Sequence, residues 1–440
     1  MRRAIVLGGS IGGVLAARVL SGHFDEVTVV ERDDLPADRP RPGVPQSAQM
    51  HILLDAGRTQ LDRWFPGFSD GMLSRGAVLA DVGSTAAFYL NGHRKVPVPG
   101  NEVISSTRPF LESYVHSRLA ECGNVVFRKG RARGLRFDSG RVSGVLFSGG
   151  DDADGSETLS SDLVVDAMGR SSRLGEWLAG AGWQPPALER LHVDLGYATA
   201  LFTRDPADSG MLAVHSLSLP DSGMPRLASM AAVEGNRWIV VVTGYARERP
   251  VRDTEDFLER CRQDPSGHFG KAVGLERMLG GVATYRHPDN RRRAFSRLSR
   301  FPGGLVALGD SVASFNPIYG QGMSSAGLHA ACLDEYLRGG PSLSEPARDY
   351  FENVDKVVAA AWQTSAASDA LLPHSSATPT RQDRAAKVVM DAVLRASLVD
   401  REVHRRFLDV ANMRAHPNTL LRPGTLLRVA RRWRTDVSPV

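Results

Sequence analysis

A glycine-rich turn close to the N-terminus has the residue types and spacing of a dinucleotide-binding site. The turn, Gly8 to Gly13, follows a short apolar run and precedes an unbroken Ala/Leu/Val stretch, and a second apolar run ends at Glu31. This order predicts a β-α-β unit in which Gly8 forms the tight turn and Gly13 allows close packing. The helix would begin near Gly12 and direct its unpaired N–H groups at a pyrophosphate. Glu31 would accept hydrogen bonds from ribose hydroxyls.

Ser10 departs from the usual pattern, because it stands where G-x-G-x-x-G has its middle glycine. Its side chain must either point away from the phosphates or hydrogen-bond one of them. Taken alone, the turn is equally compatible with an ordinary β-α-β unit that binds no nucleotide. The inference therefore needs support from other stretches of the chain.

Three further stretches place polar residues at the ends of predicted strands or at a helix start. One apolar run ends at Asp166 and turns at Gly169, and another ends in Gly309-Asp310. Ligands of open α/β sheets bind at the carboxyl ends of the strands, so both acids are candidates for contact with one ligand. Thr107-Arg108-Pro109 begins a helix, with proline at a favoured first-turn position.

In their order and sequence these stretches resemble the flavoprotein monooxygenases of the hydroxylase and epoxidase class. The finer resemblance is to bacterial epoxidases of polyether antibiotic biosynthesis, of the monensin and lasalocid type. It covers nearly the whole chain but does not identify the substrate. The matching strings are Gly43-Val-Pro-Gln46 with His51, Trp64-Phe-Pro-Gly67, DAMGRSSRLGEWL at 166–178, Val193-Asp-Leu-Gly-Tyr197 and GDSVASFNPIYGQGMSS at 309–325.

The resemblance implies FAD as the cofactor. The residues expected to bind it are Gly8, Ser10, Gly12, Gly13, Glu31, Arg32, Arg108, Asp166, Gly309, Asp310, Gly320, Gly322 and Met323. Gly320 and Gly322 would let the backbone approach the flavin ring. The helix that continues past Met323 would place partial positive charge near the N1/C2=O edge of that ring.

The resemblance also implies the reaction. FAD reduced by NADPH or NADH would react with O2 to give a C4a-hydroperoxide, whose distal oxygen converts an alkene to an epoxide. Asp166-Ala-Met-Gly169 replaces the Asp-Gly that contributes to NADPH binding in related hydroxylases. The electrons would therefore come either directly from the nicotinamide or through a separate flavin reductase. Neither a protein nucleophile nor a metal is expected.

A small apolar alkene or aromatic substrate is expected in an apolar pocket between the flavin and a β-rich domain, because the protein must exclude water and orient the double bond. Phe315, Pro317 and Tyr319 are candidates for the floor of this pocket, and His51 could hydrogen-bond flavin or substrate. Structural roles are also open. Phe315 and Tyr319 could simply pack the loop, and a single histidine at a helix start, such as His51, is more often structural than a ligand contact.

The expected fold class is α/β + β, a Rossmann-like FAD-binding domain with an inserted, mostly antiparallel β-sheet substrate domain and a helical C-terminal region. We place the FAD-binding domain at residues 1–190 and 280–340. The substrate domain is placed at 191–279, to which earlier strands could contribute, and the helical region at 341–440. The division follows from the alternating apolar runs and Pro/Gly turns of residues 191–243.

Composition is that of an ordinary soluble protein, with 42% hydrophobic and 23% charged residues and three widely spaced cysteines. We expect a cytoplasmic location and no nucleic-acid partner. The net charge of +5 is concentrated at the C-terminus, where residues 401–440 hold nine arginines and three acids. Leu426, Val429, Ala430 and Trp433 mark one apolar helical face, which either docks on the protein body or rests peripherally on an anionic membrane.

Other functions stay open on sequence alone. An aromatic hydroxylase would use the same cofactor, often with a base that ionises a phenol; Ser314 and Met323-Ser324 stand where many such enzymes have histidine and asparagine. An isoprenoid alkene reductase shares the fold. A flavin-dependent halogenase is disfavoured because the six tryptophans include no Trp-x-Trp pair. A non-catalytic nucleotide-binding or membrane-docking module would not need all of the matching stretches.

Overall fold

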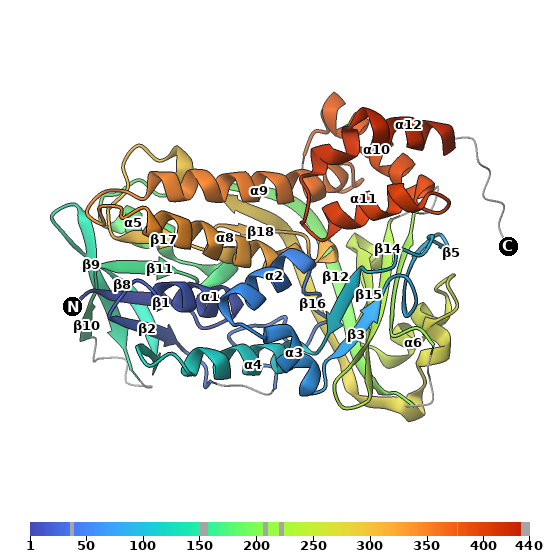
Figure 1. Ribbon diagram of the computed structural model, residues 1–440, viewed down its shortest axis with the longest axis horizontal. Coiled ribbons are helices and arrows are strands. Elements are labelled where there is room, and N and C mark those ends of the chain that lie inside the picture. Colours follow the sequence, from blue (N-terminus) through green and yellow to red (C-terminus); the bar gives the residue numbers. More distant parts are fainter. Residues whose placement is uncertain (36–38, 150–156, 206–209, 220–223, 376, 433–440) are drawn as a thin grey trace.

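Two large β-sheets lie side by side along the long axis of the molecule, and helices cover both (Figure 1). The computed structural model describes residues 1–35, 39–149, 157–205, 210–219, 224–375 and 377–432. One sheet is parallel and the other is mostly antiparallel, so the predicted fold class is confirmed.

The parallel sheet forms the core of the N-terminal part. Its strand order is β17 (Leu305–Ala307), β11 (Leu163–Asp166), β1 (Arg3–Leu7), β2 (Glu26–Glu31) and β7 (Val125–Lys129). The inner strands are nearly continuous runs of buried apolar residues, as expected for a parallel sheet with both faces covered. The covering helices include α1 (Ile11–Leu20), α4 (Arg108–Ala120) and α8 (Gln321–Arg338), and both α4 and α8 contact α1.

The second large sheet has eight strands. Their order is β18 (Ala313–Ser314), β16 (Met278–Arg293), β12 (Leu188–Thr203), β15 (Arg237–Tyr245), β14 (Arg226–Val233), β13 (Ala213–Ser218), β4 (Ala86–Leu90) and β5 (His93–Arg94). One face, with Ala198 and Phe202, packs on α6 (Thr254–Arg262) and α7 (Phe269–Ala272). Because side chains alternate along a strand, Thr199 and Leu201 point to the other face.

This sheet is larger than the predicted substrate domain at 191–279. Residues 280–293, which we assigned to the FAD-binding domain, continue β16 and pair along β12 as far as Arg293 with Leu188. From the earlier chain, β4 and β5 join it, and β4 pairs in parallel with β13. The sheet therefore extends through β16 beyond the predicted residue 279, because pairing with β12 determines where this strand ends. The strands β4 and β5 are earlier strands of the kind that the prediction allowed.

The remaining elements flank these sheets. Small sheets are formed by β8 (Arg131–Asp138), β9 (Arg141–Ser148) and β10 (Glu157–Ser160), and by β3 (Val78–Asp81) with β6 (Glu102–Ser105). Short helices are α2 (Asp55–Trp64), α3 (Phe68–Ser74) and α5 (Leu174–Gly180). The long helix α9 (Arg348–Asp369) lies along α8, as Figure 1 shows.

Three helices near the C-terminus, α10 (Arg381–Ala396), α11 (Arg401–Ala411) and α12 (Pro423–Arg432), form a small unit of their own beside the antiparallel sheet (Figure 1). In α12 the buried residues are Thr425 and Val429. Leu426 and Ala430 are exposed, so of the predicted apolar face only Val429 is docked on the protein body among the described residues. Trp433 lies outside the described residues.

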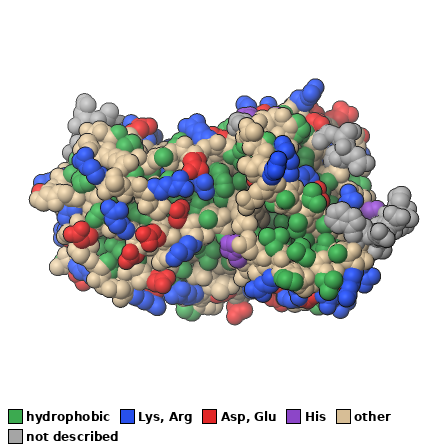
Figure 2. Space-filling view, turned by 90° about the horizontal axis from the view of Figure 1, so that it is seen from above, with side chains coloured by type: hydrophobic (Ala, Val, Ile, Leu, Met, Phe, Trp, Pro, Cys, Tyr) green, Lys and Arg blue, Asp and Glu red, His purple; other side chains and the backbone are tan. Residues whose placement is uncertain are grey.

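Hydrophobic side chains on and around α12 remain exposed at the surface. Leu427 is 54% exposed. Two further apolar side chains are exposed, Leu421 just before α12 and Val388 on α10. Figure 2 shows hydrophobic side chains gathered, with Lys and Arg beside them, on the half of the upper face where the C-terminal helices lie. Within the described ranges, no helix is both long and apolar enough to cross a membrane. Peripheral membrane contact stays a prediction.

A buried lysine lies where the C-terminal unit meets the antiparallel sheet. Lys95 follows β5 and is 5% exposed, and its Nζ lies 4.1 Å from the ring centre of Phe407. Burial lowers the pKa of Lys95 to about 7. Its charge also helps to lower the pKa values of His215 and His404, although burial of each histidine is the larger cause.

Replacing Lys95 by methionine tests the consequence of this burial. Between about pH 7 and pH 10 the unfolded chain keeps a proton that the folded protein has released, so wild-type stability rises with pH over this range. We expect Lys95→Met to stabilise the protein at pH 7 by at least about 1 kcal/mol, with the gain shrinking toward pH 10. Thermal unfolding across this pH range measures the difference. Lys271→Met, at an exposed position in α7, is the control and should show no such trend.

Candidate functional site

The carboxyl ends of four parallel strands meet at one edge of the sheet. Leu7 pairs with Asp166, which in turn pairs with Ala307, and Leu7 also pairs with Val30, next to Glu31. The glycine turn, Glu31, Asp166 and the Gly309-Asp310 turn therefore lie together, as the strand ends predicted. This is the place where open α/β sheets bind their ligands.

Close packing in the glycine turn leaves the start of α1 open to a ligand. A Cβ atom on Gly13 would lie 1.8 Å from the carbonyl oxygen of Gly8, and Gly8 itself has φ +104°. Both positions therefore require glycine. Among the described residues, no side chain caps the N-terminus of α1. Its first N–H groups are free to bind an anionic group such as a pyrophosphate.

Ser10 points away from the N-terminus of α1 and toward α4, which is the first of the two possibilities that the sequence left open. Its hydroxyl donates to Glu112 Oε1 at 2.7 Å and accepts from Arg108 Nη2 at 2.9 Å. The serine therefore replaces the middle glycine without entering the expected pyrophosphate position. It helps instead to hold Arg108.

Glu112 is a buried carboxylate between two arginines. Its Oε1 accepts from Arg108 Nε at 3.0 Å, and its Oε2 accepts from Arg41 Nε at 3.0 Å. Burial raises the pKa of Glu112, but the two arginines and the Ser10 hydroxyl outweigh this and lower it to about 2. Glu112 is therefore ionised at any physiological pH and keeps both guanidinium groups in place.

Arg41 and His116 were not predicted and complete the surroundings of the turn. Arg41 Nη1 lies 3.2 Å from Glu31 Oε2, and its Nη2 is buried without a hydrogen-bond partner in the described part of the chain. His116 Nε2 lies 2.6 Å from the carbonyl oxygen of Gly9. The spacing Arg108-x-x-x-Glu112-x-x-x-His116 on one helix was a usable signal, because residues four apart share a helix face.

Glu31 ends β2 beside the glycine turn. Its Oε2 accepts from the N–H of Gly9 at 2.8 Å, and its Oε1 accepts from the N–H of Arg32 at 2.7 Å. The predicted ribose contact would have to be shared with these backbone groups. The side chain of Arg32 is exposed.

Asp310 and the start of α8 lie across the edge from the glycine turn. Gly309 and Gly320 both have positive φ, +64° and +66°. A Cβ on Gly322 would lie 3.8 Å from Asp310 Oδ1, so the start of α8 and this carboxylate are neighbours. The carboxylate accepts no hydrogen bond from any residue that the structure describes, and burial raises its pKa although Arg108 and other arginines counteract this. An unsatisfied carboxylate here suits a ligand with hydroxyl groups.

Asp166 and Met323 are buried residues beside this edge of the sheet. Asp166 is fully buried; its Oδ1 accepts from the N–H of Met168 and from Ser311, and its Oδ2 accepts from Ser172. This carboxylate ties the end of β11 to the Gly309-Asp310 turn, so it positions the edge while its own oxygens are occupied. Met323 is 7% exposed and packs in the core.

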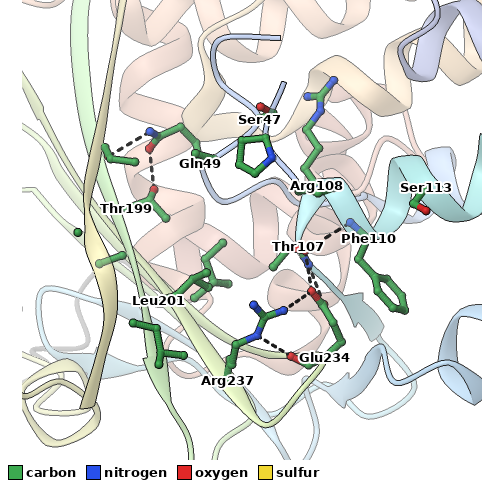
Figure 3. A pocket seen from close by; sticks show the side chains of 18 of the residues that line it. Ser47, Gln49, Thr107, Arg108, Phe110, Ser113, Thr199, Leu201, Glu234 and Arg237 are labelled. Atoms are coloured by element: carbon green, nitrogen blue, oxygen red, sulfur yellow. Dashed lines mark hydrogen bonds and ion pairs between the residues drawn. The ribbon is translucent and has the colours of Figure 1, made fainter. Parts of the chain in front are cut away.

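A cavity of about 380 Å³ lies between the start of α4 and the inner face of the antiparallel sheet (Figure 3). Its size is within the usual range for small-molecule sites. Apolar side chains line much of it, and Arg108 lies on its wall. The lining residues are Pro40, Ser47, Ala48, Gln49, Arg75, Thr107, Arg108, Pro109, Phe110, Ser113, Tyr114, Thr199, Ala200, Leu201, Glu234, Arg237, Ile239, Leu279, Gly281 and Ala283.

Two groups of hydrogen bonds join the walls of this cavity. Thr199 Oγ1 donates to Gln49 Oε1 at 2.7 Å, and Gln49 Nε2 donates to the carbonyl oxygen of Ala283 at 3.0 Å. At the other end, Glu234 accepts from both the N–H and the hydroxyl of Thr107, and it accepts from Arg237 Nη2 at 2.7 Å. Figure 3 shows these contacts on either side of Leu201.

The predicted floor residues lie elsewhere. In the part of the chain that the structure describes, Phe315, Pro317 and Tyr319 do not line this cavity. Phe315 is buried against Trp362 with ring centres 6.4 Å apart, Tyr319 faces Asp369, and Pro317 is exposed. A role as floor residues is therefore not supported for this cavity, because the loop turns the two rings toward α9.

His51 lines a much smaller space, of about 10 Å³, next to Arg108. Its Nδ1 lies 2.9 Å from the carbonyl oxygen of Gln49. Burial, and the nearby charge of Arg108, lower the pKa of His51 to about 3, so the ring is neutral at physiological pH. It can hydrogen-bond a ligand but cannot act there as a cation.

No group of three or more His, Cys, Asp or Glu side chains that could hold a metal ion occurs among the described residues.

The sequence pattern of the family described as FAD binding domain matches residues 2–337. The chain belongs to this family. Membership supports FAD as the cofactor, and the residues present fit it. The open start of α1 suits the pyrophosphate. The free Asp310 carboxylate suits the ribityl hydroxyls, and the buried Arg41 Nη2 suits a further acceptor.

Three known proteins are similar over most of the chain. Protein Rv3254 of Mycobacterium tuberculosis (strain ATCC 25618 / H37Rv) is 31% identical over 421 residues, which cover 92% of this chain and 88% of the relative. The structure of p-nitrophenol 4-monooxygenase PnpA from Pseudomonas putida DLL-E4 is 17% identical, with a TM-score of 0.64, covering 94% of this chain and 99% of that one. The flavin-dependent brominase Bmp2 is 13% identical, with a TM-score of 0.62 and 98% coverage of both chains. The last two show the shared fold.

Replacing Gly13 by alanine tests the cofactor site. The added Cβ would lie 1.8 Å from the Gly8 carbonyl oxygen, so the turn must shift away from the start of α1. We expect the dissociation constant for FAD to rise by at least about tenfold, which corresponds to about 1.4 kcal/mol. Fluorescence titration of the apoprotein with FAD measures it.

The control for this experiment is Gly22→Ala, just after the same helix. There the nearest atom to an added Cβ, the carbonyl oxygen of Val19, is 3.5 Å away, an ordinary contact. Unchanged FAD binding in a folded Gly13→Ala protein would contradict the assigned position of the pyrophosphate.

Proposed function

We propose that this protein is an FAD-dependent monooxygenase that epoxidises an alkene of a polyketide or terpenoid natural product. One observation carries the proposal: Arg108 hydrogen-bonds Ser10 in the glycine turn and also lies on the wall of the 380 Å³ cavity. The cofactor edge and the largely apolar cavity therefore meet at one side chain. A flavin bound at this edge would be next to an apolar substrate.

In this proposal the chain's own residues bind the cofactor, hold the substrate and exclude water. Arg108 and Arg41, fixed by Glu112, bind the anionic part of FAD. Leu201, Ile239 and the other apolar lining residues hold the substrate and exclude water. Bound FAD would supply the oxidising chemistry after its reduction and its reaction with O2. The electrons would come from NADPH or NADH, directly or through a flavin reductase.

The charged groups of the cavity favour epoxidation over hydroxylation of a phenol, the second candidate function. Hydroxylation of a phenol is assisted by a base that removes its proton. No histidine is found among the described residues that line the cavity, and Glu234 already accepts hydrogen bonds from Thr107 and Arg237. An alkene needs no such base. An isoprenoid alkene reductase would need FAD and a similar cavity but no O2.

Labelled oxygen separates these functions. FAD-loaded protein is reduced with NADPH or NADH, with and without an added flavin reductase, and is then mixed with 18O2 and a panel of polyene, terpene and phenol substrates. We expect a product heavier by one 18O atom from an alkene, detected by mass spectrometry. A labelled phenol product would favour the hydroxylase. An alkene reduced under anaerobic conditions, with no label incorporated under 18O2, would overturn oxygenation.

Filling the cavity tests its role as the substrate site. Leu201→Trp places a bulky ring in the space between Thr199 and Ile239. We expect KM for the alkene to rise by at least about tenfold, which corresponds to about 1.4 kcal/mol, because the added ring takes up space that the substrate would fill. FAD affinity should be unchanged.

Leu275→Trp is the matched control, since Leu275 is 69% exposed and lies outside the cavity. It should leave KM as in the wild type. Equal KM values for wild type and Leu201→Trp would show that the substrate binds elsewhere.

A further inference from the structure

A buried polar cluster joins the antiparallel sheet, the loop before α8 and the C-terminal end of α9. Its members are Tyr245 on β15, Asn290 on β16, Asn316 in the loop and Asp369, the last residue of α9. Their exposed fractions are 2%, 0%, 0% and 1%. Buried polar groups of this kind are stable when they satisfy one another.

Asp369 is the common acceptor of this cluster. Its Oδ1 accepts from Asn316 Nδ2 at 3.0 Å, and its Oδ2 accepts from Asn290 Nδ2 at 2.8 Å. The Tyr319 hydroxyl also interacts with this carboxylate, and with Ser368. Within the described part of the chain, no lysine or arginine forms an ion pair with Asp369. Only neutral groups among these residues hydrogen-bond this buried carboxylate, so its ionised form is destabilised relative to a carboxylate in water.

The arrangement fixes the loop that precedes α8. Asn316 Oδ1 accepts from the N–H of Ile318 at 3.2 Å, and its amide also donates to the Tyr245 hydroxyl at 3.1 Å. The orientation of Asn316 therefore shapes the turn 317–319. That turn ends at Gly320, the residue before α8. A change in the protonation of Asp369 would therefore affect the start of α8 through the side chains of Asn316 and Tyr319.

We propose that Asp369 is a positioning residue, whose loss or gain of a proton changes the conformation of the 316–320 loop against bound FAD. The proposal goes beyond the proposed function, since it requires FAD at the site but no oxygenation. It assigns Tyr319 a place in this cluster in place of the substrate pocket.

The side chains of Tyr319, Tyr245 and His287, which lie around Asp369, are uncharged near neutral pH. Burial raises the pKa of Asp369 to about 7, against the effect of its three donors. Tyr319 and Tyr245 have pKa values raised by burial, so both stay neutral. Behind Asn290, burial and then the charge of Arg170 lower the pKa of His287 to about 3.

One more titratable ring lies at the edge of the cluster. His374 is 6.0 Å from Tyr245 between ring centres, and its Nε2 lies 2.6 Å from the carbonyl oxygen of Val193. When Asp369 is ionised, the Tyr319 hydroxyl donates to it. When Asp369 is protonated, the same hydroxyl can accept, which reverses its orientation.

The pH dependence of the flavin spectrum tests the proposal. The absorption and fluorescence of FAD-loaded protein are recorded from pH 5.5 to pH 9. We expect a single transition in the wild type near pH 7 and none in Asp369→Asn. Asp355→Asn, on the same helix, removes a carboxylate that accepts from Ser296 and should keep the transition. A flat wild-type profile, or a transition that survives in folded Asp369→Asn, would overturn the proposal.

Tyr319→Phe keeps the test decisive if Asp369→Asn does not fold. Removing the hydroxyl removes a donor to the ionised carboxylate, so the midpoint should move to higher pH by at least about half a unit. An unchanged midpoint would contradict the proposal. Both readouts need bound FAD but no substrate, so their failure is distinct from a failure of the proposed epoxidation.

Discussion

The buried carboxylate of Glu112 is the group on which the proposed cofactor site depends. It holds Arg41 and Arg108 on opposite oxygens, and it accepts a third hydrogen bond from Ser10 of the glycine turn. Removing one partner of such a buried pair typically costs about 3–5 kcal/mol, because the remaining charges lose their compensation. A single residue of α4 thus fixes the glycine turn and the two cations that suit an anionic dinucleotide.

The same helix connects this site to the cavity. Thr107 precedes Arg108 and donates twice to Glu234 on the antiparallel sheet, while Gln49 joins the loop after Arg41 to Thr199. The two sheets are therefore linked by hydrogen bonds that form the cavity walls. The cavity of about 380 Å³ lies between these two sets of hydrogen bonds. On the other side of the cofactor edge, the Asp369 cluster links the loop before α8 to the sheet.

Local patterns in the sequence were sufficient for the parallel sheet, the glycine turn, and the positions of Glu31 and Asp310 at strand ends. They could not show Arg41, because its partner Glu112 is 71 positions away and meets it only in the fold. The directions of the Phe315 and Tyr319 rings could not be predicted, because a loop has no periodicity that tells which way a side chain points. The extension of β16 beyond residue 279 was missed for a similar reason, since this strand joins the sheet by pairing with the distant strand β12.

We propose that FAD binds with its pyrophosphate at the start of α1 and its ring system between the start of α8 and the cavity. A crystal structure of the FAD-loaded protein would show this placement. We expect the pyrophosphate to contact the first N–H groups of α1 and Arg108, and the ring system to border the space lined by Leu201 and Ile239. A dinucleotide bound away from the Gly8–Gly13 turn, or a ring system separated from the cavity by protein, would contradict this placement of FAD.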